Sequence, residues 1–381
     1  MERIYLDNAA TTRVAPEVFE AMVPWLTEHY GNPSSIHGHG RITRAAIEKA
    51  RRTVAGLLNC SPGEIVFTSG GTEADNMALR CAVRDLGVQR IISSPIEHHA
   101  VEHTVAELGD KGKVATRMVR IDARGAVDMG HLEQLLREGS GAVTLVSLMH
   151  ANNEIGTRID LEALGHLCRA NGAIFHSDTV QTMAHYRLDL RTLPVDMLAA
   201  SAHKFHGPKG VGFLYTRAGI GIKPLIHGGA QERNMRGGTE NLAGIVGLAK
   251  AMEIAYHDLE AHHAHIQGLK DRMMARLSEE IPGVVFNGDT SENSLYTVLS
   301  VRFPDDGKAE MLLYNLDIEG IACSGGSACS SGSNKGSHVL AAIAPDAPGA
   351  NIRFSFSRYN TLAEIDRTVE VLKRIFHLVV A

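Results

Sequence analysis

The stretch VDMLAASAHKFHGPKGVGFLY (195–215) joins two predicted strands through a turn that carries a lysine. Its first part, VDMLAAS, is a short run dominated by apolar residues, which is typical of a strand buried in a sheet. Lys204 follows beside the Gly/Pro turn HGPKG, and VGFLY (211–215) predicts the second strand. Because open α/β sheets bind ligands at the carboxyl ends of their strands, we expect Lys204 to lie at a ligand-binding edge.

The residues before this stretch repeat a pattern of short apolar runs separated by amphipathic windows. Predicted strands are EIVF (64–67), RIIS (90–93), AVTLVSLM (142–149) and AIFH (173–176). Predicted helices cover 72–86, 98–109 and 128–138, and an earlier helix starts at Pro16, is kinked at Pro24 and stops at Gly31. This alternation predicts an α/β fold with a mainly parallel central sheet.

A second, smaller lobe is expected after the last of these strands. A long helical stretch rich in Ala, Leu and Glu covers 240–280. It is followed by a second βαβ-like set, made of SLYTVLSV (294–301), AEMLLYNL (309–316), GIAC (320–323), NIRFSFS (351–357) and a closing helix at 361–377. We therefore expect a large domain at 15–258 and a small domain built from 1–14 and 259–381.

Length and composition limit the class of protein. A chain of 381 residues is long enough for two packed lobes, and 44% hydrophobic with 21% charged residues fits a globular protein. The net charge of −5 argues against nucleic acid as the main partner. The sequence contains neither a signal peptide nor an apolar run of roughly 18 residues, so we expect a cytoplasmic protein outside the membrane. Irregular spacing predicts reduced thiols for the five cysteines, which are Cys60, Cys81, Cys168, Cys323 and Cys329.

A carboxylate follows the neighbouring predicted strand. Asp178 comes just after AIFH, and taken alone it fits a helix cap or a surface charge. Lys204 taken alone fits a solvated charge. Together, at two strand ends, they match the needs of a pyridoxal 5′-phosphate (PLP) enzyme. There a lysine forms a Schiff base with the cofactor, and a carboxylate keeps the pyridine nitrogen protonated.

Such a cofactor also needs an anion site and a group against its ring. In FTSGGTEADN (67–76) a strand ends in two glycines and Thr72 opens a helix, so free N–H groups and the helix dipole favour a phosphate. Ser201 and His203 flank the lysine and can donate further hydrogen bonds. His98 opens a helix after RIIS, where its ring can stack on the pyridine and relay protons.

Eight motifs in order then resemble the cysteine desulfurases of the NifS/IscS group, and they cover nearly the whole chain. The motifs are DNAATT (7–12), TSGGTEADN (68–76), MHANNEIG (149–156), HSDTVQ (176–181), SAHKFHGPKGVG (201–212), RGGTEN (236–241), GGSACSSGS (325–333) and NIRFSFSR (351–358). The resemblance implies the fold-type I architecture of class V aminotransferases, with a large and a smaller α/β domain, assembled as a homodimer.

The same resemblance implies roles for the site residues. Lys204 carries the cofactor, Asp178 meets the pyridine nitrogen and His98 stacks on the ring. Residues that bind the rest of the cofactor are Asn153, Gln181 and the phosphate-binding Gly71, Thr72, Ser201 and His203. Thr239 binds the cofactor phosphate in the site of the neighbouring subunit. Arg353 binds the substrate carboxylate, because its planar guanidinium can form a bidentate contact with a carboxylate. Asn32 assists Arg353 in binding the substrate.

The Gly/Ser-rich segment CSGGSACSSGSNKGS (323–337) predicts a mobile loop that carries Cys329. By the resemblance, Cys329 accepts sulfur from L-cysteine after the freed Lys204 amine removes the α-proton, and a thiolate on a movable arm suits this step. The products are L-alanine and a persulfide on Cys329. The persulfide is passed to a sulfur acceptor, such as a scaffold protein for iron–sulfur cluster assembly.

Two departures from the family pattern and three alternatives remain open. Ala202 stands where glycine is usual, and Cys323 stands where a non-thiol residue is usual. Cys323 could be a buried small residue, a disulfide partner or a sulfur relay. Lys204 and Asp178 would serve a selenocysteine lyase or another class V PLP enzyme equally, and a non-catalytic sulfur carrier would lack a working cofactor. The histidine-rich segment 257–265 fits a solvated helix face, so we expect no metal.

Overall fold

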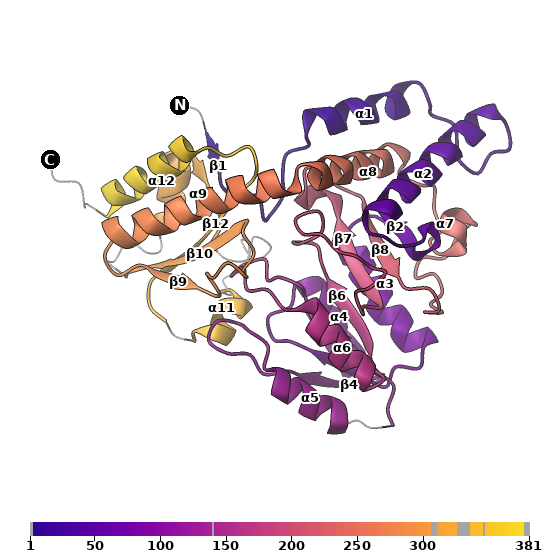
Figure 1. Ribbon diagram of the computed structural model, residues 1–381, viewed down its shortest axis with the longest axis horizontal. Coiled ribbons are helices and arrows are strands. Elements are labelled where there is room, and N and C mark those ends of the chain that lie inside the picture. Colours follow the sequence, from indigo (N-terminus) through magenta and orange to yellow (C-terminus); the bar gives the residue numbers. More distant parts are fainter. Residues whose placement is uncertain (1–2, 139–140, 306–310, 326–335, 346, 377–381) are drawn as a thin grey trace.

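The computed structural model describes residues 3–138, 141–305, 311–325, 336–345 and 347–376. Figure 1 shows a larger lobe around one sheet and a smaller lobe around another, with a long helical segment running across both. None of the helices in the described part of the chain combines the length and apolar character needed to cross a bilayer.

The large sheet confirms the predicted α/β class. Its strands are β2 (Ile65–Thr68), β3 (Arg90–Ser93), β4 (Ala115–Met118), β5 (Thr144–Ser147), β6 (Ile174–Asp178), β7 (Met197–Ser201) and β8 (Gly212–Thr216). They lie in the order β2-β8-β7-β6-β5-β3-β4, and β8 alone runs opposite to the other strands. The sheet is therefore mainly parallel. The edge strand β4 was not expected, because three of its four residues are exposed and it lacks an apolar run.

Helices cover both faces of this sheet. They are α1 (Pro16–Thr27), α2 (Gly38–Leu57), α3 (Gly71–Asp85), α4 (His99–Asp110), α5 (Met129–Glu138), α6 (Leu161–Ala170), α7 (Gln231–Asn234) and α8 (Leu242–His257). Alternate residues of a strand serve the two faces: Leu198 belongs to the cluster under α2, α6 and α8, whereas Met197 belongs to the cluster under α3 and α4. The strands are thus apolar on both sides, which is why they read as continuous apolar runs.

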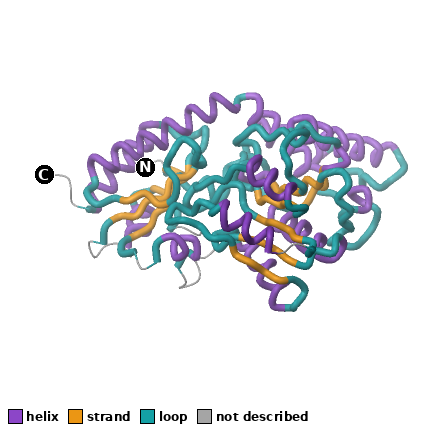
Figure 2. Tube along the Cα trace, turned by 60° about the horizontal axis from the view of Figure 1, so that its bottom comes forward, coloured by secondary structure: helices purple, strands orange, loops and turns teal. Residues whose placement is uncertain are grey.

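Two predicted helix boundaries were wrong. Helix α1 ends at Thr27 and not at Gly31, because the N–H groups of Glu28 and His29 both donate to the Pro24 carbonyl and close the last turn early. The stretch 240–280 is two helices, α8 and α9 (Leu259–Glu280), separated at Asp258. Figure 2 shows these two helices passing along one side of both lobes.

The smaller lobe holds an antiparallel sheet in the order β12-β10-β9, from β9 (Val285–Asn287), β10 (Val298–Phe303) and β12 (Ala350–Ser355). Beside it, β1 (Ile4–Tyr5) pairs in parallel with β11 (Ile321–Ala322), and the remaining helices are α10 (Leu312–Ile318), α11 (His338–Ile343) and α12 (Leu362–Ile375). The expected βαβ-like set was therefore wrong in strand direction, since an apolar pattern does not encode whether two strands run parallel.

Buried apolar residues form separate clusters in the two lobes. The largest is drawn from residues 15–256, and the next from residues 4–6 and 266–372. A small cluster of Ala9, Ala151, Leu295 and Val298 lies between them. The proposed domain boundary at residue 258 falls between the two large clusters and stays a prediction.

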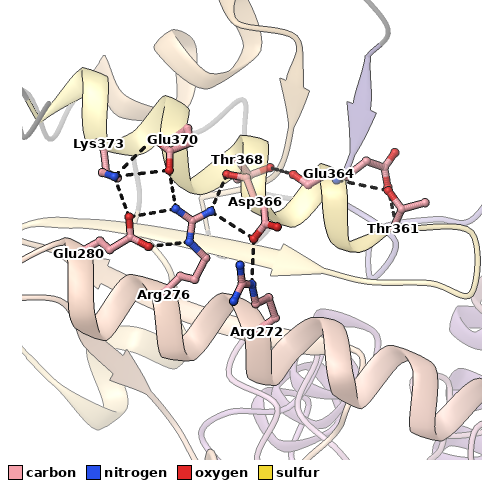
Figure 3. Close-up of polar contacts among 9 residues, drawn as sticks. All are labelled: Arg272, Arg276, Glu280, Thr361, Glu364, Asp366, Thr368, Glu370 and Lys373. Carbon is pink, nitrogen blue, oxygen red and sulfur yellow. Dashed lines mark hydrogen bonds and ion pairs between the residues drawn. The ribbon is translucent and has the colours of Figure 1, made fainter.

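An ion-pair network ties α9 to α12 on the outer side of the small lobe (Figure 3). Its members are Arg272, Arg276, Glu280, Asp366, Glu370 and Lys373. Arg276 contacts three carboxylates, two of them on α12. Several of these side chains are widely exposed, so solvent screening keeps the contribution of each pair small.

A second ion pair is buried in the large lobe. Arg51 of α2 and Glu232 of α7 form a two-pronged pair at 2.7 and 2.8 Å, with side chains 2% and 3% exposed. Arg51 also donates to Ile65 O, and Glu232 accepts from Phe67 N, so the pair fixes both helices to β2. Removing one partner would leave a buried charge without compensation.

We predict that Arg51→Met lowers the free energy of unfolding by about 3–5 kcal/mol. Arg272→Met, at an exposed arginine of the network in Figure 3, is the matched control and should change it by no more than about 1 kcal/mol. Urea denaturation followed by circular dichroism measures both. Equal effects of the two substitutions would contradict the assignment.

Candidate active site

Asp178 and Lys204 meet at one edge of the large sheet, as expected. Asp178 is the last residue of β6, and Lys204 ends the short 3-10 helix Ala202–Lys204 that follows β7. Since β6 and β7 are parallel neighbours, both residues line one cavity of about 290 Å³. Other residues that line it are Gly71, Thr72, His98, Asn153, Gln181, Ser201, His203 and Arg353. The structure therefore brings together most of the predicted site.

The Lys204 amine is held by the N-terminal segment. Its Nζ donates to the carbonyl oxygens of Ala9 and Ala10, at 2.6 and 3.0 Å. Gln181 Nε2 donates to the same Ala9 oxygen at 3.0 Å. Two backbone carbonyls of the DNAATT motif thus fix where the lysine nitrogen lies in the cavity.

Asp178 is a buried carboxylate facing a cationic lysine. Burial raises the pKa of its carboxyl to about 6, although the Val180 N–H and the Lys204 charge oppose the shift. The Val180 N–H donates to Oδ1 at 2.8 Å and orients the group. A cationic ring nitrogen beside Asp178 would favour its ionised form, so this environment suits a protonated pyridine.

Asp75 adds a second buried carboxylate that was not expected to belong to the site. It lines the cavity from α3, and burial together with the charges of Asp178 and Glu97 raises its pKa well above the usual value. Its Oδ1 lies 3.4 Å from Nε2 of His176, whose own pKa is lowered to about 3 by burial. The sequence signal was its spacing, since Asp75 stands one turn after the predicted phosphate residue Thr72.

The start of α3 forms the anion end of the cavity. The N-cap residue Gly70 provides no side chain to cap the first N–H groups, which leaves them for a ligand. A Cβ at Gly71 would lie 2.5 Å from Cγ2 of Val180, so glycine lets the helix approach the loop after β6. Ala202 packs in the core of the large lobe and is not among the residues that line the cavity, so this departure from the family pattern leaves the anion end unchanged.

His98 is a neutral imidazole at the N-cap of α4. Burial, and then the charge of Lys204, lowers its pKa to about 4. Its Nδ1 accepts from the Ala100 N–H at 3.1 Å, so the ring proton sits on Nε2. The ring is therefore uncharged at neutral pH, as a stacking group requires.

Arg353 brings the small lobe into the site. It projects from β12, is 1% exposed, and donates to Asn153 O at 3.0 Å and to Asp7 Oδ1 at 2.9 Å. Its Nε has no hydrogen-bond partner among the described residues. A buried guanidinium with a spare donor is suited to bind a carboxylate.

Three predicted residues are not brought into this cavity. Thr239 is exposed and lines a separate hollow with Ser69 and Arg236. Asn32 is exposed between α1 and α2. Cys329 lies outside the described residues. The roles of these residues therefore stay predictions.

Comparison with known proteins decides the family: the aminotransferase class-V profile matches residues 4–368. The chain belongs to this family. A cysteine desulfurase IscS of Dictyoglomus turgidum is 44% identical, over 98% of this chain and 94% of the relative. A solved NifS-like protein has a TM-score of 0.91 at 39% identity, over 99% of this chain and all of the other. Another, SspA in complex with cysteine, has a TM-score of 0.80 at 32% identity, over 94% and 100%.

Class V aminotransferases use PLP, and the residues of this cavity fit it. Lys204 would hold its aldehyde carbon, Asp178 its ring nitrogen, and the start of α3 with Ser201 and His203 its phosphate. The resemblance seen in the sequence motifs is confirmed, as are the fold class and the cofactor.

We predict that Asp178→Asn weakens PLP binding to the apoprotein by about 10-fold or more, because a charge-assisted hydrogen bond becomes a neutral one. The amide oxygen still accepts from Val180 N–H, so the fold is kept. Fluorescence titration with PLP measures the dissociation constant. An unchanged constant would rule out contact between Asp178 and the cofactor.

Proposed function

We propose that this chain is a cysteine desulfurase. It removes sulfur from L-cysteine and releases L-alanine, and Cys329 holds the sulfur as a persulfide for transfer to an acceptor protein. The observation that carries the proposal is that the segment bearing Cys329 begins and ends at the cavity. A loop thiol there distinguishes a desulfurase from an aminotransferase on the same fold.

Both ends of that segment are anchored. The backbone N–H of Arg353 donates to Ser324 O at 2.6 Å, and Ser324 Oγ donates to Asp7. At the other end Ser337 donates to Glu154, which lines the cavity. Cys329 follows Ser324 by five residues in the sequence, so an anchored residue stands close to it along the chain.

The side chains of the cavity have separate roles in the proposed reaction. Bound PLP supplies a ring that stabilises negative charge at the α-carbon of an amino acid. Arg353 binds the carboxylate of cysteine and orients its α-proton toward Lys204, whose amine removes it. His98 is neutral, and its Nε2–H can donate a proton at the ring face. The Cys329 thiolate attacks the substrate sulfur, the bond between that sulfur and the β-carbon breaks, and the β-carbon that keeps the electron pair is protonated.

The four described cysteines are poor candidates for the sulfur acceptor. Burial raises the pKa of Cys60, Cys168 and Cys323 to about 12, and that of Cys81 to about 11. The nucleophile in this chemistry is the thiolate, which is scarce in these groups at neutral pH. Cys323 is half-buried and packs against the small-lobe core, which supports its reading as a small packing residue.

We further propose a cytoplasmic homodimer in which Thr239 completes the phosphate site of the partner subunit. An exposed threonine outside its own cavity suits that arrangement. Asn32 would assist the substrate, and an iron–sulfur scaffold protein is the acceptor we expect.

The direct test incubates the protein with L-cysteine and a reductant and measures both products. We expect equal amounts of sulfide and alanine from the wild type, and loss of both from Cys329→Ser with PLP still bound. A keto acid product, or a Cys329→Ser enzyme with full turnover, would overturn the proposal in favour of another class V enzyme. Selenocysteine-only turnover would indicate a selenocysteine lyase.

A second prediction concerns cysteine reactivity. With limiting iodoacetamide at pH 7.5, we expect alkylation of Cys329 at least about 10-fold faster than of the other four thiols, whose raised pKa values suppress the thiolate. Peptide mass spectrometry at several times measures the rates, with Cys329→Ser as the control. Labelling of Cys323 at the rate of Cys329 would contradict its assignment as an inert residue.

A further inference from the structure

A cluster of imidazoles surrounds one carboxylate at the edge of the cavity. Glu102 Oε2 lies 2.8 Å from His99 Nδ1 and 3.9 Å from His338 Nε2. His99 and Glu102 belong to the first turn of α4, and His338 is the first residue of α11. The three side chains are half-buried, and none of them has a role in the desulfurase mechanism above.

The spacing of the ligand atoms fits a transition metal. One ligand atom from each residue lies within 4.8 Å of the others. Tetrahedral Zn²⁺ with bonds of about 2.0–2.1 Å separates its ligand atoms by about 3.3 Å, a value between the two distances to Glu102. Small side-chain rotations would bring both distances to Glu102 to this value.

The chemistry of the set is also that of a metal site. Two imidazoles and one glutamate are the protein ligands of several catalytic zinc centres, which leave a fourth position open. The rings of His99 and His338 lie 4.7 Å apart between centroids with their planes tilted by 35°, so the two side chains are neighbours. His338 Nε2 now donates to Glu97 O at 2.9 Å, a bond that would be exchanged for coordination.

We propose that His99, Glu102 and His338 bind a Zn²⁺ ion. His99 and His338 both line the cavity, so the site lies at its edge. A water molecule completes the tetrahedron. The site needs neither the cofactor nor Cys329, so it stands independently of the proposed desulfurase function.

Isothermal titration calorimetry tests the site with ZnCl₂ as the probe. The untagged PLP-bound protein carries Cys329→Ser, which removes the loop thiol as a competing ligand, and cysteine is left out of the buffer. We expect one Zn²⁺ per chain, and affinity weakened at least about 100-fold by each of His99→Gln, Glu102→Gln and His338→Gln.

His103→Gln is the matched control. His103 stacks on His99 at 4.7 Å, lies 4.0 Å from Glu102, and is outside the three-residue cluster. Its substitution should leave the affinity within about threefold, since it supplies no ligand. Absence of a one-to-one site, or an unchanged affinity in all three ligand variants, would overturn the proposal.

X-ray absorption on the Zn²⁺-loaded Cys329→Ser protein guards against variants that fail to fold. Two imidazole ligands and oxygen are the expected shell. A sulfur ligand, or fewer than two imidazoles, would contradict the site. These readouts require no turnover, so their failure would leave the desulfurase proposal untouched, and the reverse also holds.

Discussion

Two parallel strands that end side by side determine this active site, because they bring one buried carboxylate next to one lysine. Asp178 ends β6 and is buried, whereas Lys204 follows β7 and is half-buried. A buried carboxylate is unfavourable unless a positive group or hydrogen bonds compensate it. The Val180 N–H and Lys204 do so in part, and a protonated pyridine beside Asp178 would complete the compensation.

The N-terminal segment connects this charge pair to Arg353 of the small lobe. Ala9 and Ala10 accept from Lys204, Asp7 accepts from Arg353, and Asn8 donates to Ser355 O on β12. One short motif therefore positions groups from both lobes. Asp7 also accepts from Ser324, so the start of the Cys329 segment is fixed by the same carboxylate that holds Arg353.

Strands and their carboxyl-end residues were predictable because buried parallel strands leave a strong apolar signal. Asp178, Lys204, Thr72 and His98 follow such runs directly, and all four line the cavity. Strand direction in the small lobe was not predictable, since it depends on long-range pairing. The Ala9 and Ala10 carbonyls and the His338 contact with Glu102 were missed for the same reason: they are set by the approach of distant segments. Asp75 is different, because its spacing of one helical turn from Thr72 was a local signal.

The central claim is that Lys204 is the lysine that holds PLP. Borohydride reduction of the purified protein, followed by tryptic digestion and mass spectrometry, tests it most directly. We predict one phosphopyridoxyl group, on the peptide that contains Lys204. Modification of Lys209 in the same turn, of another lysine, or of none would contradict the account.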